Sequence, residues 1–221
     1  MPLNYNFNHK NFSTHWAVRR LSMKPVLFVF DMGDVIIKES HVWHDVFSNF
    51  GLDVRNIREL GPNATLAVQR ALVGKIEEKG FWSLVEKDVA RKLTWEGVLE
   101  ASYSCYPIEG SIQIIRSLLS KGFRVVCGTN NIRPFYNRIK AEGYYDIFPK
   151  VYSSFKIGIS KPDPEFWRFI ADQENIRLQN MFFADDNRTN IEAAASLGVK
   201  THQFFGADGL REYIERLGIS L

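Results

Sequence analysis

Short apolar runs and amphipathic stretches alternate along most of the chain. The run 26–30, VLFVF, is continuous, apolar and of strand length, which predicts a strand buried on both faces. The elements predicted after residue 107 are helix 109–122, strand 123–129, helix 133–143, strand 150–154, helix 163–173, strand 181–184, helix 190–198, strand 200–205 and helix 209–218. Because strands that alternate with helices form parallel sheets, we predict an α/β fold with helices on both faces of the sheet.

The segment 39–107 interrupts this alternation. Its apolar residues recur at helical spacings, and no buried strand is predicted among them. They are Trp43, Val46, Phe47 and Phe50, then residues 66–73, and then Phe81, Trp82, Leu84 and Val85. We therefore predict an all-helical insertion at 39–107, a core formed by 24–38 and 108–221, and an N-terminal extension at 1–23.

Composition is that of an ordinary globular protein. Of the 221 residues, 45% are hydrophobic and 24% charged, which excludes a disordered or fibrous chain. No apolar run approaches the roughly 20 residues that span a bilayer, so we expect no membrane anchor. The two cysteines, Cys105 and Cys127, are too few for a disulfide framework. A reducing compartment fits best, and we expect a cytoplasmic protein.

The net charge of +3 comes from the first 22 residues, which hold Lys10, Arg19 and Arg20 and no acidic residue. Without these three, 25 basic residues balance 25 acidic ones, so we expect no nucleic-acid partner. Two interpretations of this leader stay open. It has the composition of a transit peptide, and it also fits a loose extension ahead of a start at Met23.

Polar residues follow the predicted strands at their carboxyl ends, where open α/β sheets bind ligands. They are Asp31, Thr129, Asn130, Lys161, Asp185 and Asp186. Facing carboxylates repel one another unless a cation lies between them, and oxygen ligands favour Mg²⁺. One carboxylate could then attack phosphorus and form an aspartyl-phosphate, while the hydroxyl and the amine bind the other phosphate oxygens.

Each of these residues also has a structural interpretation. An aspartate after a strand commonly forms a turn, and Asp185 and Asp186 precede a helix that they could cap. Thr129 could satisfy backbone groups, and Lys161 could be a solvated loop charge. The functional interpretation depends on the ordered set, with each member at its own strand end.

The ordered set resembles the haloacid dehalogenase-like hydrolase superfamily. The motifs are VFDMGDV at 29–35, GTNN at 128–131, SKPDPEFW at 160–167 and FFADDNRTNIEAAASLGV at 182–199. The resemblance implies a Rossmann-like core with a helical cap inserted after the first strand. It also implies that Asp31 is the nucleophile, and that Thr129, Asn130 and Lys161 bind the substrate phosphate. The implied Mg²⁺ ligands are Asp31, the backbone carbonyl of Gly33, Asp186 and Asp185, the last directly or in support.

One position departs from the family pattern. Family phosphatases usually carry a second aspartate two residues after the nucleophile, where this chain has Gly33; Asp34 lies one residue further on. The chain is similar to a small capped branch with an Asp-x-Gly-x-Val motif, which includes sugar 1-phosphate phosphatases. Such substrates release a hemiacetal hydroxyl, which is more acidic than a simple alcohol and needs less help from an acid.

We therefore predict a Mg²⁺-dependent phosphatase that acts on a small phosphorylated metabolite, with a sugar phosphate favoured. Asp34 is a candidate for the proton transfer, and another residue or water stays open for this role. Two alternatives stay open: a catalytically silent domain that binds a phosphorylated ligand or a protein, and a 2-haloacid dehalogenase. In the cap, His41 and His44 are candidate substrate contacts, whereas Trp43 is predicted to be core. A monomer and a homodimer both fit the sequence.

Overall fold

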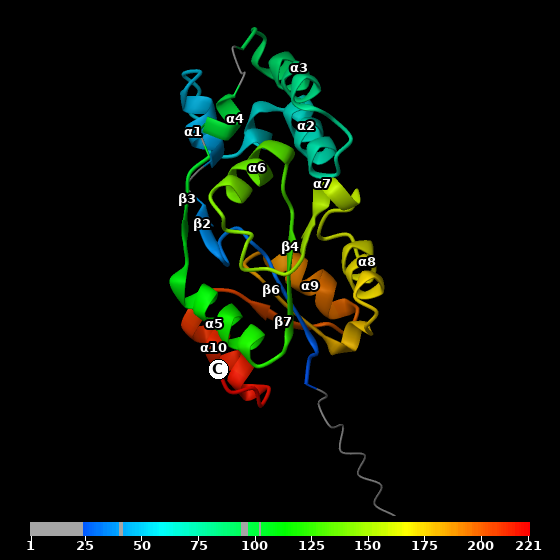
Figure 1. Cartoon of the computed structure of the whole chain (residues 1–221). Coiled ribbons are helices and arrows are strands. Elements are labelled where there is room, and N and C mark those ends of the chain that lie inside the picture. Colours follow the sequence, from blue (N-terminus) through cyan, green and yellow to red (C-terminus); the bar gives the residue numbers. More distant parts are fainter. Residues whose placement is uncertain (1–23, 40–41, 94–96, 102) are drawn as a thin grey trace, which may run out of the picture.

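The fold is built on a five-stranded parallel sheet (Figure 1). The computed structural model describes residues 24–39, 42–93, 97–101 and 103–221, so the predicted extension at 1–23 lies outside the described residues. The sheet has the order β5-β4-β1-β6-β7. Its strands are β1 (Leu27–Phe30), β4 (Arg124–Thr129), β5 (Val151–Ser153), β6 (Met181–Asp185) and β7 (Lys200–Gln203). The predicted α/β fold is confirmed.

Strand β1 lies at the centre, with β4 and β6 as parallel neighbours. All four of its residues are fully buried, because alternate side chains point into two separate hydrophobic clusters. Phe28 and Phe30 pack into one cluster, and Leu27 and Val29 into the other. The continuous apolar run is therefore the pattern expected of a central strand in a covered parallel sheet.

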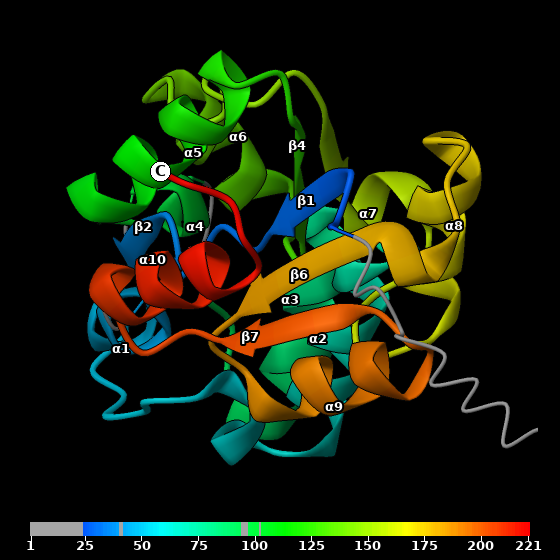
Figure 2. The ribbon, with the colours of Figure 1, turned by 90° about the horizontal axis from the view of Figure 1, so that it is seen from below.

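Helices cover both faces of the sheet, as Figure 2 shows. The cluster of Phe28 and Phe30 includes residues of α5 (Glu109–Ser120), α6 (Arg133–Ala141) and α10 (Ala207–Arg216). The cluster of Leu27 and Val29 includes residues of α8 (Glu165–Gln173) and α9 (Arg188–Ser196). The remaining core elements are α7 (Ser154–Ile157) and the short 3-10 helix η2 (Leu178–Asn180).

The inserted helices lie beyond the carboxyl ends of the strands (Figure 1). They are α1 (Val42–Ser48), the 3-10 helix η1 (Ile57–Leu60), α2 (Pro62–Leu72), α3 (Glu78–Val89) and α4 (Val98–Ala101). Trp43 packs between Phe81 and Phe135, with ring centroids 6.2 and 5.3 Å away. This agrees with its predicted place in the core, and it joins the inserted helices to α6 of the sheet domain.

A two-stranded antiparallel ribbon connects the two parts of the molecule. Strand β2 (Ile37–Glu39) leads out of the core and pairs with β3 (Cys105–Pro107), which leads back. The expectation that 39–107 is helical throughout was wrong at β3. Its three residues are half-buried or exposed, so the strand has neither the length nor the apolar run by which strands are recognised in a sequence.

Two further observations bear on the class of protein. None of the helices in the described part of the chain is long and apolar enough to cross a membrane. Cys105 and Cys127 are both free thiols.

Candidate active site

Asp31 directly follows β1 and lies at the centre of the site. Its backbone N–H donates to the Ala184 carbonyl at 2.9 Å, which extends the pairing of β1 with β6 by one residue. Its carboxylate accepts a hydrogen bond from the Met32 N–H at 2.8 Å. The side chain is 14% exposed, so a ligand can reach it while the strand below holds it in place.

Lys161 links the carboxyl ends of β1 and β6. Its ammonium group lies 2.9 Å from Oδ1 of Asp31 and 2.7 Å from Oδ2 of Asp185, and its side chain is fully buried. The loop that carries it is tied to the end of β4 by Asn130. The amide of Asn130 donates to the Lys161 carbonyl at 2.8 Å and accepts from the Lys161 N–H at 2.9 Å.

Asp185 is the most firmly held carboxylate of the site. It ends β6, is fully buried, and accepts from the Asn187 N–H at 2.8 Å and from the Asn190 amide at 3.1 Å on both oxygens. Together with Lys161 these donors satisfy most of its acceptor capacity. Asp186, the next residue, is exposed, so the adjacent acids differ: one is locked into the fold and the other faces the site.

Asp31, Asp185 and Asp186 form a candidate metal site. Each offers a carboxylate oxygen, and these atoms lie within 4.8 Å of one another. When all three are ionised, Lys161 neutralises only one of the three negative charges. Oxygen-only donors in a site with surplus negative charge fit a hard divalent cation. The prediction that these strand ends converge on one edge of the sheet agrees with this geometry.

The pKa shifts of the site residues show the same imbalance of charge. Burial raises the pKa of Asp31 to about 8, against the opposing charge of Lys161 and with Asp185 adding to the rise. Burial and the neighbouring Asp185 and Asp34 also raise the pKa of Asp186. Burial lowers the pKa of Lys161, but the two carboxylates beside it outweigh burial and raise it overall. Ionised Asp31 therefore needs more positive charge than Lys161 supplies.

The other predicted site residues have more varied surroundings. Thr129 ends β4 and is buried at the same edge of the sheet as Asp31. Asp34 has a left-handed φ of 53° and forms an ion pair with Lys38 at 2.6 Å. His44 lies on α1 and faces two acids of the inserted part, with its ring nitrogens 3.6 Å from Asp45 and 3.7 Å from Asp53. His41 lies outside the described residues.

Two positions missed by sequence reasoning contribute to the site. Asn190, which binds both oxygens of Asp185, is a buried polar residue in the first turn of α9, and its motif alone does not reveal that role. Glu39, at the end of β2, accepts a hydrogen bond from the Tyr103 hydroxyl at 2.8 Å. Burial raises the pKa of Glu39, and the charges of Asp34 and Asp186 add to the rise. The spacing of residues along the sequence does not predict that Glu39 lies near these residues, because its position depends on the pairing of β2 with β3.

A cavity of about 150 Å³ lies where the inserted helices meet the sheet domain. It is lined by residues of α2, α3, α6 and α7 and of the loops beside them, including Phe81, Ile132 and Phe155. Arg133 and Glu77, whose side chains are 3.3 Å apart, bridge the two parts at its rim. The strand-end residues do not line this cavity.

The model of the haloacid dehalogenase-like hydrolases matches residues 26–198. The chain belongs to this family. The match begins at β1, includes the inserted helices and ends after α9, so it contains every strand-end residue described above. The resemblance inferred from the four motifs is confirmed.

Two curated relatives agree with this assignment, and a solved structure shares the fold. Flavin mononucleotide hydrolase 1 of Arabidopsis thaliana is 25% identical over 92% of this chain and 82% of its own length. D-ribitol-5-phosphate phosphatase of Bacteroides thetaiotaomicron is 26% identical, over 79% and 89% respectively. A family enzyme of B. thetaiotaomicron, solved in complex with magnesium and inorganic phosphate, matches with a TM-score of 0.64 and 19% identity, covering 80% of this chain and 93% of that one. At this identity the structural likeness shows a shared fold.

Proposed function

We propose that this hydrolase is a Mg²⁺-dependent phosphatase that acts on a small phosphorylated metabolite through a phosphoenzyme on Asp31. The observation that carries the proposal is the contact of Lys161 with Asp31 and Asp185 beside exposed Asp186. A 2-haloacid dehalogenase would have no cation to place among these acids. Bound Mg²⁺ would supply positive charge to the carboxylates and to the phosphate oxygens.

In this mechanism each residue of the site has its own role. An oxygen of Asp31 attacks phosphorus and forms the aspartyl-phosphate as the ester P–O bond breaks and the alcohol leaves. Lys161 and Thr129 stabilise the charge on the phosphate oxygens. Asp186 and the Gly33 carbonyl would hold the cation. Asp185 would support that arrangement, since most of its acceptor capacity is already used within the fold. Water then cleaves the acyl phosphate and restores Asp31.

For the substrate we propose a phosphate monoester of a sugar or a sugar alcohol. The Asp-x-Gly-x-Val motif suits sugar 1-phosphates, whose leaving groups are comparatively acidic. The two curated relatives are named for flavin mononucleotide and D-ribitol-5-phosphate, and both compounds are phosphate esters at the end of a ribityl chain. The inserted segment 39–107, proposed as the cap, would select among such compounds through the cavity next to Phe81 and Ile132.

The first experiment measures phosphate release from an aryl phosphate and from a panel that contains both substrate types. We expect turnover with added Mg²⁺ and loss of turnover with a chelator, restored when Mg²⁺ is returned. Asp31→Asn should lower kcat at least 10,000-fold, roughly the range for loss of a nucleophile, while the circular dichroism spectrum stays that of the wild type. Asp163→Asn, a change at the exposed start of α8, is the control.

The outcomes separate the three candidate functions. Turnover that is insensitive to the chelator would contradict the proposed metal dependence. Halide release from a 2-haloacid would identify a dehalogenase. An absence of all turnover, together with saturable binding of phosphorylated compounds, would identify a binding domain instead.

A further inference from the structure

The leaving oxygen of an alkyl phosphate must receive a proton as its bond to phosphorus breaks, because a free alkoxide is a poor leaving group. The same position later needs a base that takes a proton from the attacking water. Gly33 has no side chain to offer there, so another group must act. The identity of this group matters only if the chain is a phosphatase, and its assignment therefore rests on the proposed function.

Most carboxylates around Asp31 are already engaged. Asp185 is bound by Lys161 and by Asn190. Asp186 belongs to the candidate metal site. Asp34, the acid expected from the sequence, forms its ion pair with Lys38, and both side chains are more than a third exposed. Among the described residues this leaves one further carboxylate beside the loop that follows Asp31, that of Glu39.

Glu39 occupies the place that a side chain at Gly33 would take. A Cβ atom built on Gly33 would lie 2.7 Å from Oε1 and 2.9 Å from Cδ of Glu39. Gly33 is not among the glycines with positive φ, so its backbone conformation does not require glycine. A side chain at residue 33 would instead meet the end of the Glu39 side chain, which would have to move aside. Because residue 33 is glycine, the Glu39 carboxylate can occupy the space beside it.

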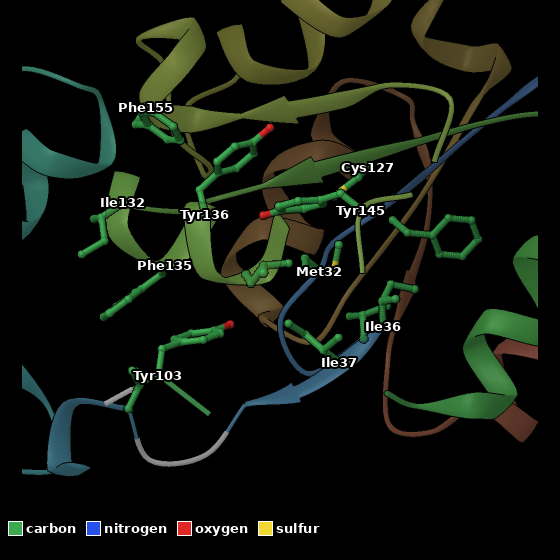
Figure 3. Packing of buried hydrophobic residues seen from close by; sticks show 14 of the residues in the cluster. Met32, Ile36, Ile37, Tyr103, Cys127, Ile132, Phe135, Tyr136, Tyr145 and Phe155 are labelled. Atoms are coloured by element: carbon green, nitrogen blue, oxygen red, sulfur yellow. The ribbon is translucent and has the colours of Figure 1, made fainter. Parts of the chain in front are cut away.

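Tyr103 holds the carboxylate in this place. Its hydroxyl donates to Oε1 of Glu39 at 2.8 Å, and the residue is only 2% exposed. Its ring lies next to that of Phe135 (Figure 3). The two rings are stacked, with centroids 5.0 Å apart. Among the described residues this is the one hydrogen bond found for the Glu39 carboxylate, and Oε2 makes none. A single fixed contact orients the group and leaves one oxygen for proton transfer.

We propose that Glu39 is the general acid and base of this phosphatase, acting from β2 in the position that Gly33 leaves open. As the Asp31–phosphorus bond forms and the ester P–O bond breaks, the carboxyl proton of Glu39 passes to the leaving oxygen, which departs as the alcohol. In the second step a water attacks phosphorus, the Asp31–phosphorus bond breaks, and Glu39 takes the proton of that water. Each turnover consumes one water and returns Glu39 to its starting state.

The test compares Glu39→Gln with the wild type on an alkyl and an aryl phosphate in the presence of Mg²⁺. The glutamine side chain keeps the size of the glutamate and can still accept from Tyr103, but it carries no transferable proton. We expect the first turnover on the alkyl phosphate to slow by roughly 100- to 10,000-fold. The first turnover on the aryl phosphate should fall far less, because a phenolate leaves without a proton. Phosphoenzyme should then accumulate, because its hydrolysis lacks a base.

A relocation experiment provides the matched control. Glu39→Ala should show the same selective loss on the alkyl phosphate, and Gly33→Asp added to it should recover roughly tenfold or more by restoring a carboxylate at the vacated place. In the wild-type background, Gly33→Asp brings a second carboxylate to the same place, so Glu39 must shift aside. Glu109→Gln, a change in the first turn of α5, serves as the unrelated glutamate control.

The results distinguish failure of this proposal from failure of the proposed function. If the wild type hydrolyses neither ester, the chain is not a phosphatase. If the wild type is active and Glu39→Gln slows the first turnover equally on both esters, or on neither, the assignment of Glu39 is wrong. Thermal unfolding of each variant shows whether a loss reflects an altered fold.

Discussion

Two carboxylates reach the candidate site from different parts of the molecule, and the fold supports them differently. Asp185 ends a central strand, is fully buried, and receives donors from Lys161, Asn187 and Asn190. Glu39 ends a ribbon strand, and its described hydrogen bond comes from Tyr103 across the ribbon. The sheet alone is sufficient to place Asp185. Glu39 and Tyr103 flank the inserted helices, so the placement of Glu39 depends on how the cap returns to the core.

The largest effect on stability is expected on the sheet side of the site, formed by Asp31, Lys161 and Asp185. Lys161→Met leaves Asp31 and Asp185 without their buried cation, and we expect the free energy of unfolding to fall by about 3–5 kcal/mol. Urea unfolding measures the change. The control Lys92→Met removes an exposed partner of Glu86 and should leave the free energy of unfolding almost unchanged. Equal losses would mean that the buried pair does not hold the strand ends together.

A smaller effect is expected when only a neutral donor to Asp185 is lost. Asn190→Ala removes both bonds to its oxygens and should lower the free energy of unfolding by about 1–3 kcal/mol, because Asp185 has no access to water. Asn187→Ala removes an exposed cap of α9 and should cost about 1 kcal/mol. The comparison fails if Asn190→Ala proves the milder change in urea unfolding.

On the ribbon side, Tyr103→Phe should reduce the free energy of unfolding less than Lys161→Met does. It should also slow the reaction mainly on alkyl phosphates. The loss of one hydroxyl should lower the free energy of unfolding by about 1 kcal/mol. Without its donor, Glu39 loses its orientation, so the first turnover on an alkyl phosphate should slow by about tenfold while that on an aryl phosphate changes less. Tyr145→Phe, which loses a contact with Asn131, is the control. A uniform decrease on both esters would indicate a purely structural role for Tyr103.

A third carboxylate, Glu174, has two half-exposed cationic partners, Arg124 and Lys150, and should give the smallest effect. Burial opposes its ionisation, but hydrogen bonds from Tyr152 and Lys150 and the charge of Arg124 outweigh burial and lower the pKa of Glu174. A depressed pKa stabilises the native state above the ordinary pKa of a glutamate, and this contribution is lost as the pH falls through the native value. Glu174→Gln should therefore reduce stability by about 1 kcal/mol or less at pH 7 and leave it unaltered at low pH. Urea unfolding at several pH values tests this, and a loss that persists at low pH would contradict it.

The sheet side of the site could be predicted from the sequence almost residue by residue. Asp31, Thr129, Lys161 and Asp185 each follow or adjoin an element whose apolar pattern is strong, and parallel strands bring their carboxyl ends to one edge. The ribbon side could not be predicted in this way. Strand β3 is too short and too exposed to produce a recognisable pattern, and without it Glu39 has no known neighbour.

The sequence by itself determined the order of the core elements and the carboxylates that converge on Lys161, because these follow from local periodicity and from the geometry of parallel strands. The family was indicated by the resemblance of its four motifs. Only the tertiary structure decided which group takes the space beside Gly33. That space is filled by residue 39, held by residue 103 beside the ribbon that joins the inserted helices to the core. Such a contact depends on long-range pairing, which no local spacing encodes.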